Sequence, residues 1–323
     1  MKPATMAVGC CHRTIPPLRF PASFNQQHPK PRSLLTSKRL PAGSWDSHVH
    51  VILPSKFPLV ADAEYHPPSH TISEAIDFEH SLGIQRMVLV QPSCYGNDNS
   101  CMIDALKRLG PVFGRGVVSF DPWTISTDQL AHWHQLGVRG VRVNLQSVGK
   151  RLSKYQLRRD LERCAHLILP YDWAIQLYVP MGMVALLEDI LPRLQVKTCL
   201  DHFGSPPIDA LGSKFSEPSQ IPGFNSLVSL LQRRNTWVKI SAQYRLSNDP
   251  DYRDLEVLFD EFAAVAPQRL IYGTDWPHTR FEDIDSNRFA KTCLRWASKS
   301  GIVDSLFRDA AIELWAAQHD LNQ

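Results

Sequence analysis

The chain has 323 residues, of which 43% are hydrophobic and 21% are charged, as in an ordinary globular protein. No run of about 18 uncharged apolar residues occurs, which excludes a membrane-spanning helix. Seven of the 35 basic residues and none of the 32 acidic ones lie in the first 45 residues, so the rest has 28 basic residues and a net charge of −4. This mildly acidic body argues against nucleic-acid binding.

The N-terminal segment differs from the rest of the chain. Residues 1–43 contain seven prolines and no periodic apolar pattern, which predicts an irregular, disordered extension ahead of one domain over residues 44–323.

The seven cysteines form no C-x-x-C pair, and those at 94, 164, 199 and 293 lie in apolar runs where a free thiol packs as a small hydrophobe. The cysteines predict a reducing, cytoplasmic location. The basic, acid-free extension makes a mitochondrial one the alternative.

From residue 44 onward, short apolar runs alternate with longer amphipathic segments. The expected strands are 44–52, 86–92, 112–120, 138–145, 173–179, 196–202, 236–242 and 269–274. The expected helices are 71–82, 98–109, 126–136, 153–168, 181–191, 221–233, 249–265, 284–298 and 301–318. Eight such units predict an α/β fold, a (β/α)₈ barrel with a buried parallel sheet. The competing doubly wound sheet lacks support, because no G-x-G-x-x-G, P-loop or G-x-S-x-G motif is present.

Polar side chains concentrate where the expected strands end, which is where barrels of this class carry their active sites. The first strand ends in Asp46, His48 and His50, whose alternation predicts that all three share one face. Burying so many polar groups is costly unless they serve a site. The further candidates at the strand ends are Gln91, Ser93, Tyr95, Arg142, Asn144, Gln176, Tyr178, Asp201, His202, Ser241, Tyr244, Arg245, Asp275 and His278.

The H-x-H motif of the first strand, the single histidine of the sixth and the aspartate of the eighth resemble the amidohydrolase superfamily. Within it, the chain is similar to the lactonases of the 2-pyrone-4,6-dicarboxylate type. The segments that carry this resemblance are DSHVHVILPSKFPL, VLVQPSCYGNDNSCMIDAL, GVRGVRVNL, CLDHFGSP, VKISAQYR and YGTDWPH. They run in the expected order from residue 45 to about 280, and they imply a (β/α)₈ hydrolase of aromatic-compound or secondary metabolism.

The resemblance also bears on metal binding. Metal-dependent amidohydrolases take a ligand from the fifth strand, a histidine or a carboxylated lysine, but this chain has Gln176 and Tyr178 there. Three histidines and an aspartate could still bind zinc in principle. Because the lactonase branch resembled here works without metal, we expect no obligatory cofactor. Partial zinc occupancy would be compatible with this expectation.

Lactone hydrolysis requires an activated water, an oxyanion site and a proton for the leaving oxygen. Asp275 is the predicted general base, and His48, His50 and His202 are predicted to polarise the carbonyl. The planar guanidinium groups of Arg142 and Arg245 suit substrate carboxylates. The predicted neutral hydrogen-bond partners of the substrate are Tyr178, Ser93, and Tyr95 or Tyr65.

Three further basic residues have expected roles near Arg142. The family places a further basic residue after Arg142, a role that Lys150 or Arg151 would fill here, and without it a lactone with one carboxylate or a sugar lactone fits better. Arg139, three residues before Arg142, is expected to face the helices and to be structural.

The predicted partner is a small anionic lactone, with no nucleic acid and no membrane. The oligomeric state cannot be read from the sequence. Two alternatives remain open at this stage: a metal-dependent decarboxylase of aromatic acids from the same superfamily, and a non-catalytic barrel that binds an anion.

Overall fold

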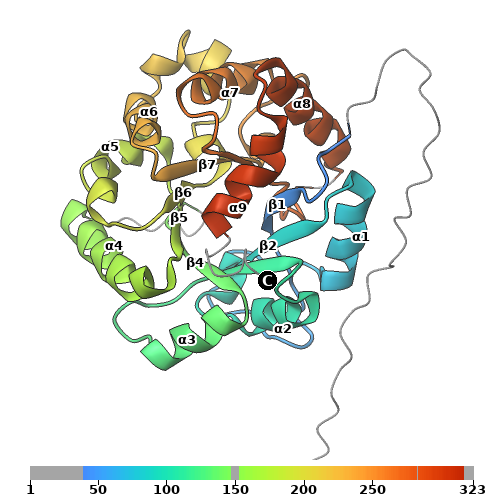
Figure 1. The fold of residues 1–323 in the computed structure, drawn as a ribbon, viewed down its shortest axis with the longest axis vertical. Coiled ribbons are helices and arrows are strands. Elements are labelled where there is room, and N and C mark those ends of the chain that lie inside the picture. Colours follow the sequence, from blue (N-terminus) through green and yellow to red (C-terminus); the bar gives the residue numbers. More distant parts are fainter. Residues whose placement is uncertain (1–38, 147–152, 282, 316–323) are drawn as a thin grey trace, which may run out of the picture.

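A computed structural model describes residues 39–146, 153–281 and 283–315 of the chain (Figure 1). Eight strands form one sheet in the order β1 to β8, and each neighbouring pair is parallel. The strands are Trp45–Val49, Arg86–Val90, Gly114–Val118, Val138–Asn144, Ala174–Tyr178, Thr198–Leu200, Thr236–Ile240 and Leu270–Tyr272. The predicted (β/α)₈ barrel is confirmed. Residues 1–38 of the expected N-terminal extension lie outside the described residues.

Helices surround the ring of strands in Figure 1. The helices α1 to α9 are Ile72–Leu82, Ser100–Leu109, Thr127–Gln135, Lys154–Ile168, Val184–Leu187, Phe224–Gln232, Arg253–Val265, Ser286–Lys299 and Ala310–Trp315. Local sequence explains several of their starts: Thr71 and Ser153 each form a capping box with the side chain three residues later, Glu74 and Gln156.

One expected helix is wrong in its extent. Residues 181–191 form a 3₁₀ turn at Met181–Met183, the single-turn α5 and then a second 3₁₀ turn at Leu191–Arg193. Pro192 explains why the segment does not continue as a regular helix, because its ring blocks the helical hydrogen bond and crowds the preceding turn.

The barrel closes where the chain beyond β8 meets β1. Val49 forms a parallel bridge with Trp276, the His50 N–H donates to the Trp276 carbonyl at 2.8 Å, and the Asp275 N–H donates to the His48 carbonyl at 2.9 Å. The seam that closes the barrel is therefore made by the backbone of the predicted site residues themselves. Any shift in the closure would move both histidines relative to Asp275.

The interior of the barrel is filled from below by α9, which lies across the ring of strands in Figure 1. Trp315 packs with Trp45, Ala174 and Trp237 in this inner layer, and its indole N–H donates to Ser47 Oγ at 3.3 Å. A Cβ on Gly140 would lie 3.0 Å from a backbone oxygen and 3.2 Å from the Trp315 ring, so glycine permits this close approach.

Cys94, Cys101, Cys164, Cys199 and Cys293 are all buried and free. The four that the sequence assigns to the core therefore do pack there. Among the described residues, none of the helices is both long and apolar enough to cross a membrane.

Candidate active site

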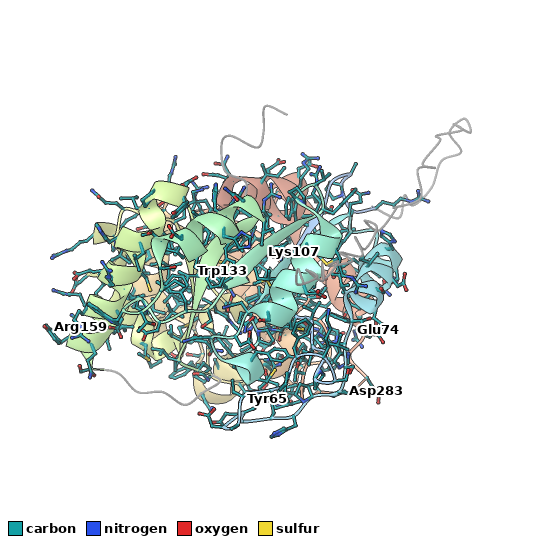
Figure 2. The ribbon with its side chains drawn as sticks, turned by 90° about the horizontal axis from the view of Figure 1, so that it is seen from below. Tyr65, Glu74, Lys107, Trp133, Arg159 and Asp283 are labelled. Atoms are coloured by element: carbon teal, nitrogen blue, oxygen red, sulfur yellow. The ribbon has the colours of Figure 1, made fainter. Side chains whose placement is uncertain are left out.

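A pocket opens at the carboxyl ends of the strands. In the side view of Figure 2, Tyr65 and Asp283, from the loops that follow β1 and β8, lie at the same edge of the molecule. The pocket has an empty volume of about 360 Å³, part of it open to solvent. Its lining residues are His50, Tyr65, Ser93, Arg142, Tyr178, His202, Arg245, Asp275, Thr279 and Arg280.

Asp275 is the electrostatic centre of the pocket. Its Oδ2 accepts hydrogen bonds from the Tyr244 hydroxyl at 2.6 Å and from Arg245 Nε at 3.0 Å. Its Oδ1 lies 3.5 Å from the Nε2 atoms of both His48 and His50. Burial alone would raise the pKa of Asp275, but the positive charge of Arg245, helped by the histidines, holds it well below the ordinary value. The carboxylate is therefore ionised, with Oδ1 facing the imidazoles.

The backbone at the strand ends is held in left-handed conformations. The φ angles are 63° for Asp275, 53° for His202 and 53° for Ala242, just after β8, β6 and β7. Residues other than glycine adopt this region at a cost of about 1–3 kcal/mol, and such residues cluster at functional sites. Here the turn places the next side chains over the barrel mouth, including Tyr244 and Arg245 on the 3₁₀ turn Gln243–Arg245.

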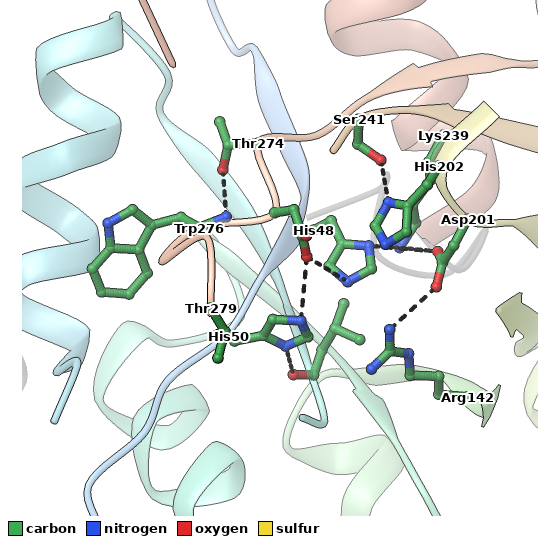
Figure 3. Close-up of polar contacts among 12 residues, drawn as sticks. His48, His50, Arg142, Asp201, His202, Lys239, Ser241, Thr274, Trp276 and Thr279 are labelled. Carbon is green, nitrogen blue, oxygen red and sulfur yellow. Dashed lines mark hydrogen bonds and ion pairs between the residues drawn. The ribbon is translucent and has the colours of Figure 1, made fainter. Parts of the chain in front are cut away.

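His50 has a defined orientation. Its Nδ1 lies 2.7 Å from the Val90 carbonyl oxygen, which can only accept, so Nδ1 carries a proton (Figure 3). In the neutral ring, Nε2 then presents a lone pair towards Asp275 Oδ1. Two acceptors 3.5 Å apart at the pocket wall are suited to bind a molecule that donates to both, such as water.

His202 lies on the opposite wall. Its Nδ1 is 2.8 Å from Ser241 Oγ, its ring stacks on His48 with centroids 4.8 Å apart, and Tyr178 meets it edge-on at the same distance. Burial lowers the pKa of His202 to about 4, although the nearby Asp275 opposes the shift. The ring is therefore neutral at physiological pH.

His48 lies below the pocket and does not line it. The side chain is fully buried between Asp275 above and the Lys239–Asp201 pair below. The predicted direct contact of His48 with the substrate carbonyl therefore does not fit the structure, because the His48 side chain is fully buried and is not part of the pocket lining. His48 contacts the predicted base instead.

Asp201 connects the buried polar side chains that lie beneath the pocket. Its carboxylate accepts from Gln176 Nε2 at 2.9 Å. It also lies 3.5 Å from Arg142 Nη2 and 3.3 Å from Lys239 Nζ (Figure 3). Burial would raise the pKa of Asp201, but Lys239 and His48 keep it well below the ordinary value. Arg142 also donates to the Gln91 carbonyl at 3.1 Å, so one side of its guanidinium is held by the barrel.

Two predicted placements are wrong. Asp46 does not share a face with His48 and His50, because β1 is irregular between Asp46 and Val49, and the Asp46 carboxylate instead accepts from the Thr274 N–H and hydroxyl. Tyr95 is fully buried, and its hydroxyl accepts from the Leu53 N–H at 2.9 Å, so it fixes a loop rather than the substrate.

Of the two tyrosines offered as substrate contacts, Tyr65 rather than Tyr95 lies at the pocket. Its hydroxyl accepts from Ser93 Oγ at 3.2 Å at the pocket wall. Arg139 bonds the carbonyls of His134 and Val138, away from the pocket, as expected for a structural residue. Lys150 and Arg151 lie outside the described residues.

Three residues of the site were not among the candidates that the sequence offered. Lys239 lies beneath His48, and Thr279 and Arg280 line the pocket from the loop after β8. Lys239 had a visible signal: it is the one charged residue inside the strand sequence TWVKI. The other two lie in a loop, where the direction of a side chain cannot be read from alternation. Tyr244 was a candidate without an assigned role, and in the structure its hydroxyl donates to Asp275.

The side chains around Asp275 include potential ligands for a divalent cation. His48, His50 and Asp275 each offer a ligand atom to one cluster, and separations of 3.5 Å suit neighbouring ligands of one small metal ion. The bond from His50 Nδ1 to a carbonyl is also common around metal ligands. The residue types and spacing are those of a metal site, and a metal there would polarise a carbonyl or a water. Lys239 and Arg245, however, place positive charge on His48 and Asp275, which disfavours a cation at this cluster.

Comparisons with known proteins agree with this architecture. The sequence profile of the Amidohydrolase family matches residues 45–316. The 4-sulfomuconolactone hydrolase of Hydrogenophaga intermedia is 33% identical over 76% of this chain and 78% of its own. The 2-pyrone-4,6-dicarboxylate hydrolase of Comamonas testosteroni is 31% identical over 76% and 80%.

A solved structure from Pseudomonas putida, provisionally named a 2-pyrone-4,6-dicarboxylic acid hydrolase, matches in fold as well. It is 29% identical, with a TM-score of 0.71 over 85% of this chain and 98% of its own. The family match spans the whole barrel, from the H-x-H strand to the helix that fills its floor. The chain belongs to the amidohydrolase family.

Proposed function

We propose that the protein hydrolyses a small lactone that carries at least one carboxylate. The observation that carries this proposal is the ionised Asp275, whose Oδ1 faces His50 Nε2 at the wall of a pocket lined by three arginines. The named functions of its relatives, hydrolysis of 4-sulfomuconolactone and of 2-pyrone-4,6-dicarboxylate, support this substrate class. Both are anionic cyclic esters.

The proposed reaction begins with a water that donates one proton each to Asp275 Oδ1 and His50 Nε2. Asp275 removes a proton as the water oxygen attacks the lactone carbonyl. His202 donates from Nε2 to the carbonyl oxygen as it gains charge, with the Ser241 hydroxyl donating to Nδ1. The ring C–O bond then breaks, and the proton held by Asp275 passes to the leaving oxygen, which gives the open-chain acid.

The substrate carboxylate requires a cation that the protein does not already use. Arg245 is bound to Asp275, and Arg142 is bound to the Gln91 carbonyl and lies beside Asp201. Arg280 is exposed at the rim above the Tyr65 ring and forms no ion pair with any described residue. We therefore assign the first contact with the substrate carboxylate to Arg280, with Arg142, Tyr178 and Ser93 deeper in the pocket.

Replacing Arg280 with methionine is expected to raise KM for a carboxylated lactone about tenfold, which corresponds to ~1.4 kcal/mol, and to leave kcat within about twofold. An uncharged lactone should show no change in KM. Steady-state kinetics on both substrates measure the difference. Lys56→Met removes another exposed cation from the loop after β1, where Lys56 pairs with Asp104, and serves as the control. Equal effects of Arg280→Met on charged and uncharged lactones would contradict the assignment.

We further propose that the reaction needs no metal. The support is the charge around the ligand cluster, where Lys239 and Arg245 are already in place, and Gln176, whose amide nitrogen donates to Asp201 and is no metal ligand. Dialysis against a chelator should leave the rate of lactone hydrolysis within about twofold, as followed by proton release with metal content measured in parallel. A loss of activity that zinc or manganese restores would sink the metal-free reaction, and decarboxylation of an aromatic acid would then be the reaction to assay.

A further inference from the structure

A lysine lies at the floor of the active site. Lys239, inside β7, is fully buried, and its Nζ lies 3.3 Å from both His48 Nδ1 and Asp201 Oδ1 (Figure 3). Trp315 of α9 covers the ammonium from below, with the ring centroid 5.4 Å from Nζ. An ammonium group can donate hydrogen bonds but cannot accept them. Its contact with His48 Nδ1 is therefore a donation to a nitrogen lone pair.

The second neighbour of His48 Nδ1 would impose the opposite arrangement. Asp201 Oδ1 lies 3.4 Å away and could only accept a proton from Nδ1. The contact from Lys239 has hydrogen-bond geometry, and the ammonium has no lone pair that could accept a proton from Nδ1. The donation from Lys239 to Nδ1 leaves Nε2 as the ring nitrogen that carries the proton.

We infer that Lys239 is a positioning residue that holds His48 with its proton on Nε2, and that this keeps His48 from acting as a metal ligand. A metal ligand needs the Nε2 lone pair, which the protonated nitrogen does not offer. In this form Nε2–H points to Asp275 Oδ1, 3.5 Å away. The inference rests on the metal-free reaction proposed above. It adds the residue that prevents a cation from binding to the cluster of His48, His50 and Asp275.

Removing Lys239 should reverse the arrangement. His48 Nδ1–H would then donate to Asp201 Oδ1, and Nε2 would turn its lone pair to the cluster with His50 and Asp275. The carboxylate of Asp201 would then hold one ring nitrogen of His48, and the other nitrogen would be free to bind a metal, as in many metal sites. The lysine variants should therefore gain a zinc site that the wild-type protein lacks.

The test is a zinc titration in competition with a chromophoric chelator. Lys239→Gln and Lys239→Met are expected to bind Zn²⁺ at least tenfold more tightly than the wild type, and adding His48→Ala should abolish the gain. Lys197→Gln is the matched control, since Lys197 pairs with Asp172 outside the pocket. The inference fails if the wild type binds zinc as tightly as the Lys239 variants, or if the gain survives without His48.

A second measurement keeps the inference testable even if the Lys239 variants do not fold. Imidazole ¹⁵N spectra of the wild type, with the His48 signals assigned by their loss in His48→Ala, should show the proton on Nε2. A proton on Nδ1 would overturn the inference. Neither readout uses the lactone, so a protein that hydrolyses no lactone but shows this tautomer would refute the proposed function and leave the role of Lys239 standing.

Discussion

Asp275→Asn is expected to lower kcat for lactone hydrolysis by about 10²- to 10⁴-fold, the range for losing a general base. The amide has nearly the same shape and can still meet Tyr244 and Arg245, but its oxygen cannot take a proton from water. KM should change by no more than a few fold, because the substrate carboxylate is bound elsewhere. Steady-state kinetics on purified protein, with thermal melting to confirm folding, measure the effect.

The control for this variant is Asp254→Asn. Asp254 is a partly buried carboxylate in α7 that accepts from Ser247 at 2.7 Å and lies outside the pocket lining. Its replacement should leave kcat unchanged within about twofold. If Asp275→Asn kept more than a tenth of the wild-type kcat, another group would have to be the base.

Glu79→Gln is expected to stabilise the protein at alkaline pH. Glu79 of α1 is buried and lies next to the buried carboxylate of Asp46. Burial and the nearby Asp46 carboxylate raise the pKa of Glu79 well above its ordinary value of 4.5. The folded protein therefore keeps a proton that the unfolded chain releases above that value.

The sign of the effect follows from this proton. An acid with a raised pKa in the folded state gives stability that is complete below its unfolded pKa and is lost as the pH rises towards the folded pKa. Each pH unit in that interval costs the wild type about 1.4 kcal/mol of unfolding free energy. Glutamine bears no such proton, so the variant should gain relative to the wild type as the pH rises above 4.5 towards the folded-state pKa of Glu79.

Urea unfolding at pH 5, 6.5 and 8 measures this difference. Asp77→Asn, which removes an exposed carboxylate from the same helix, is the control variant. An offset for Glu79→Gln that does not change with pH would mean that Glu79 is ionised in the folded protein.

The fold was readable from the sequence because parallel strands buried on both faces leave a repeated apolar signature. The positions of His50, His202 and Asp275 were readable for the same reason, since each lies at or just past a strand end. The prediction for Asp46 was wrong because the irregularity in β1 interrupts the alternation of side chains. No residue in the sequence DSHVH indicates this irregularity.

The residues on turns could not be oriented from the sequence. Tyr95 follows β2 on a 3₁₀ turn that directs its hydroxyl to the Leu53 N–H. Tyr244 and Arg245 lie after Ala242, whose positive φ decides where they point. The conformation of such residues depends on packing between distant segments, which a single sequence does not encode locally.

The position of Trp315 has a consequence for the recovery of activity after denaturation. This residue of α9 bonds Ser47 of β1 and covers Lys239 of β7, so the chemistry depends on contacts between segments that are far apart in the chain. A species in which α9 has not yet met β1 and β7 would lack this lower lining. Catalysis should then return in step with the slowest phase of tryptophan burial, and no partly assembled species should turn over substrate.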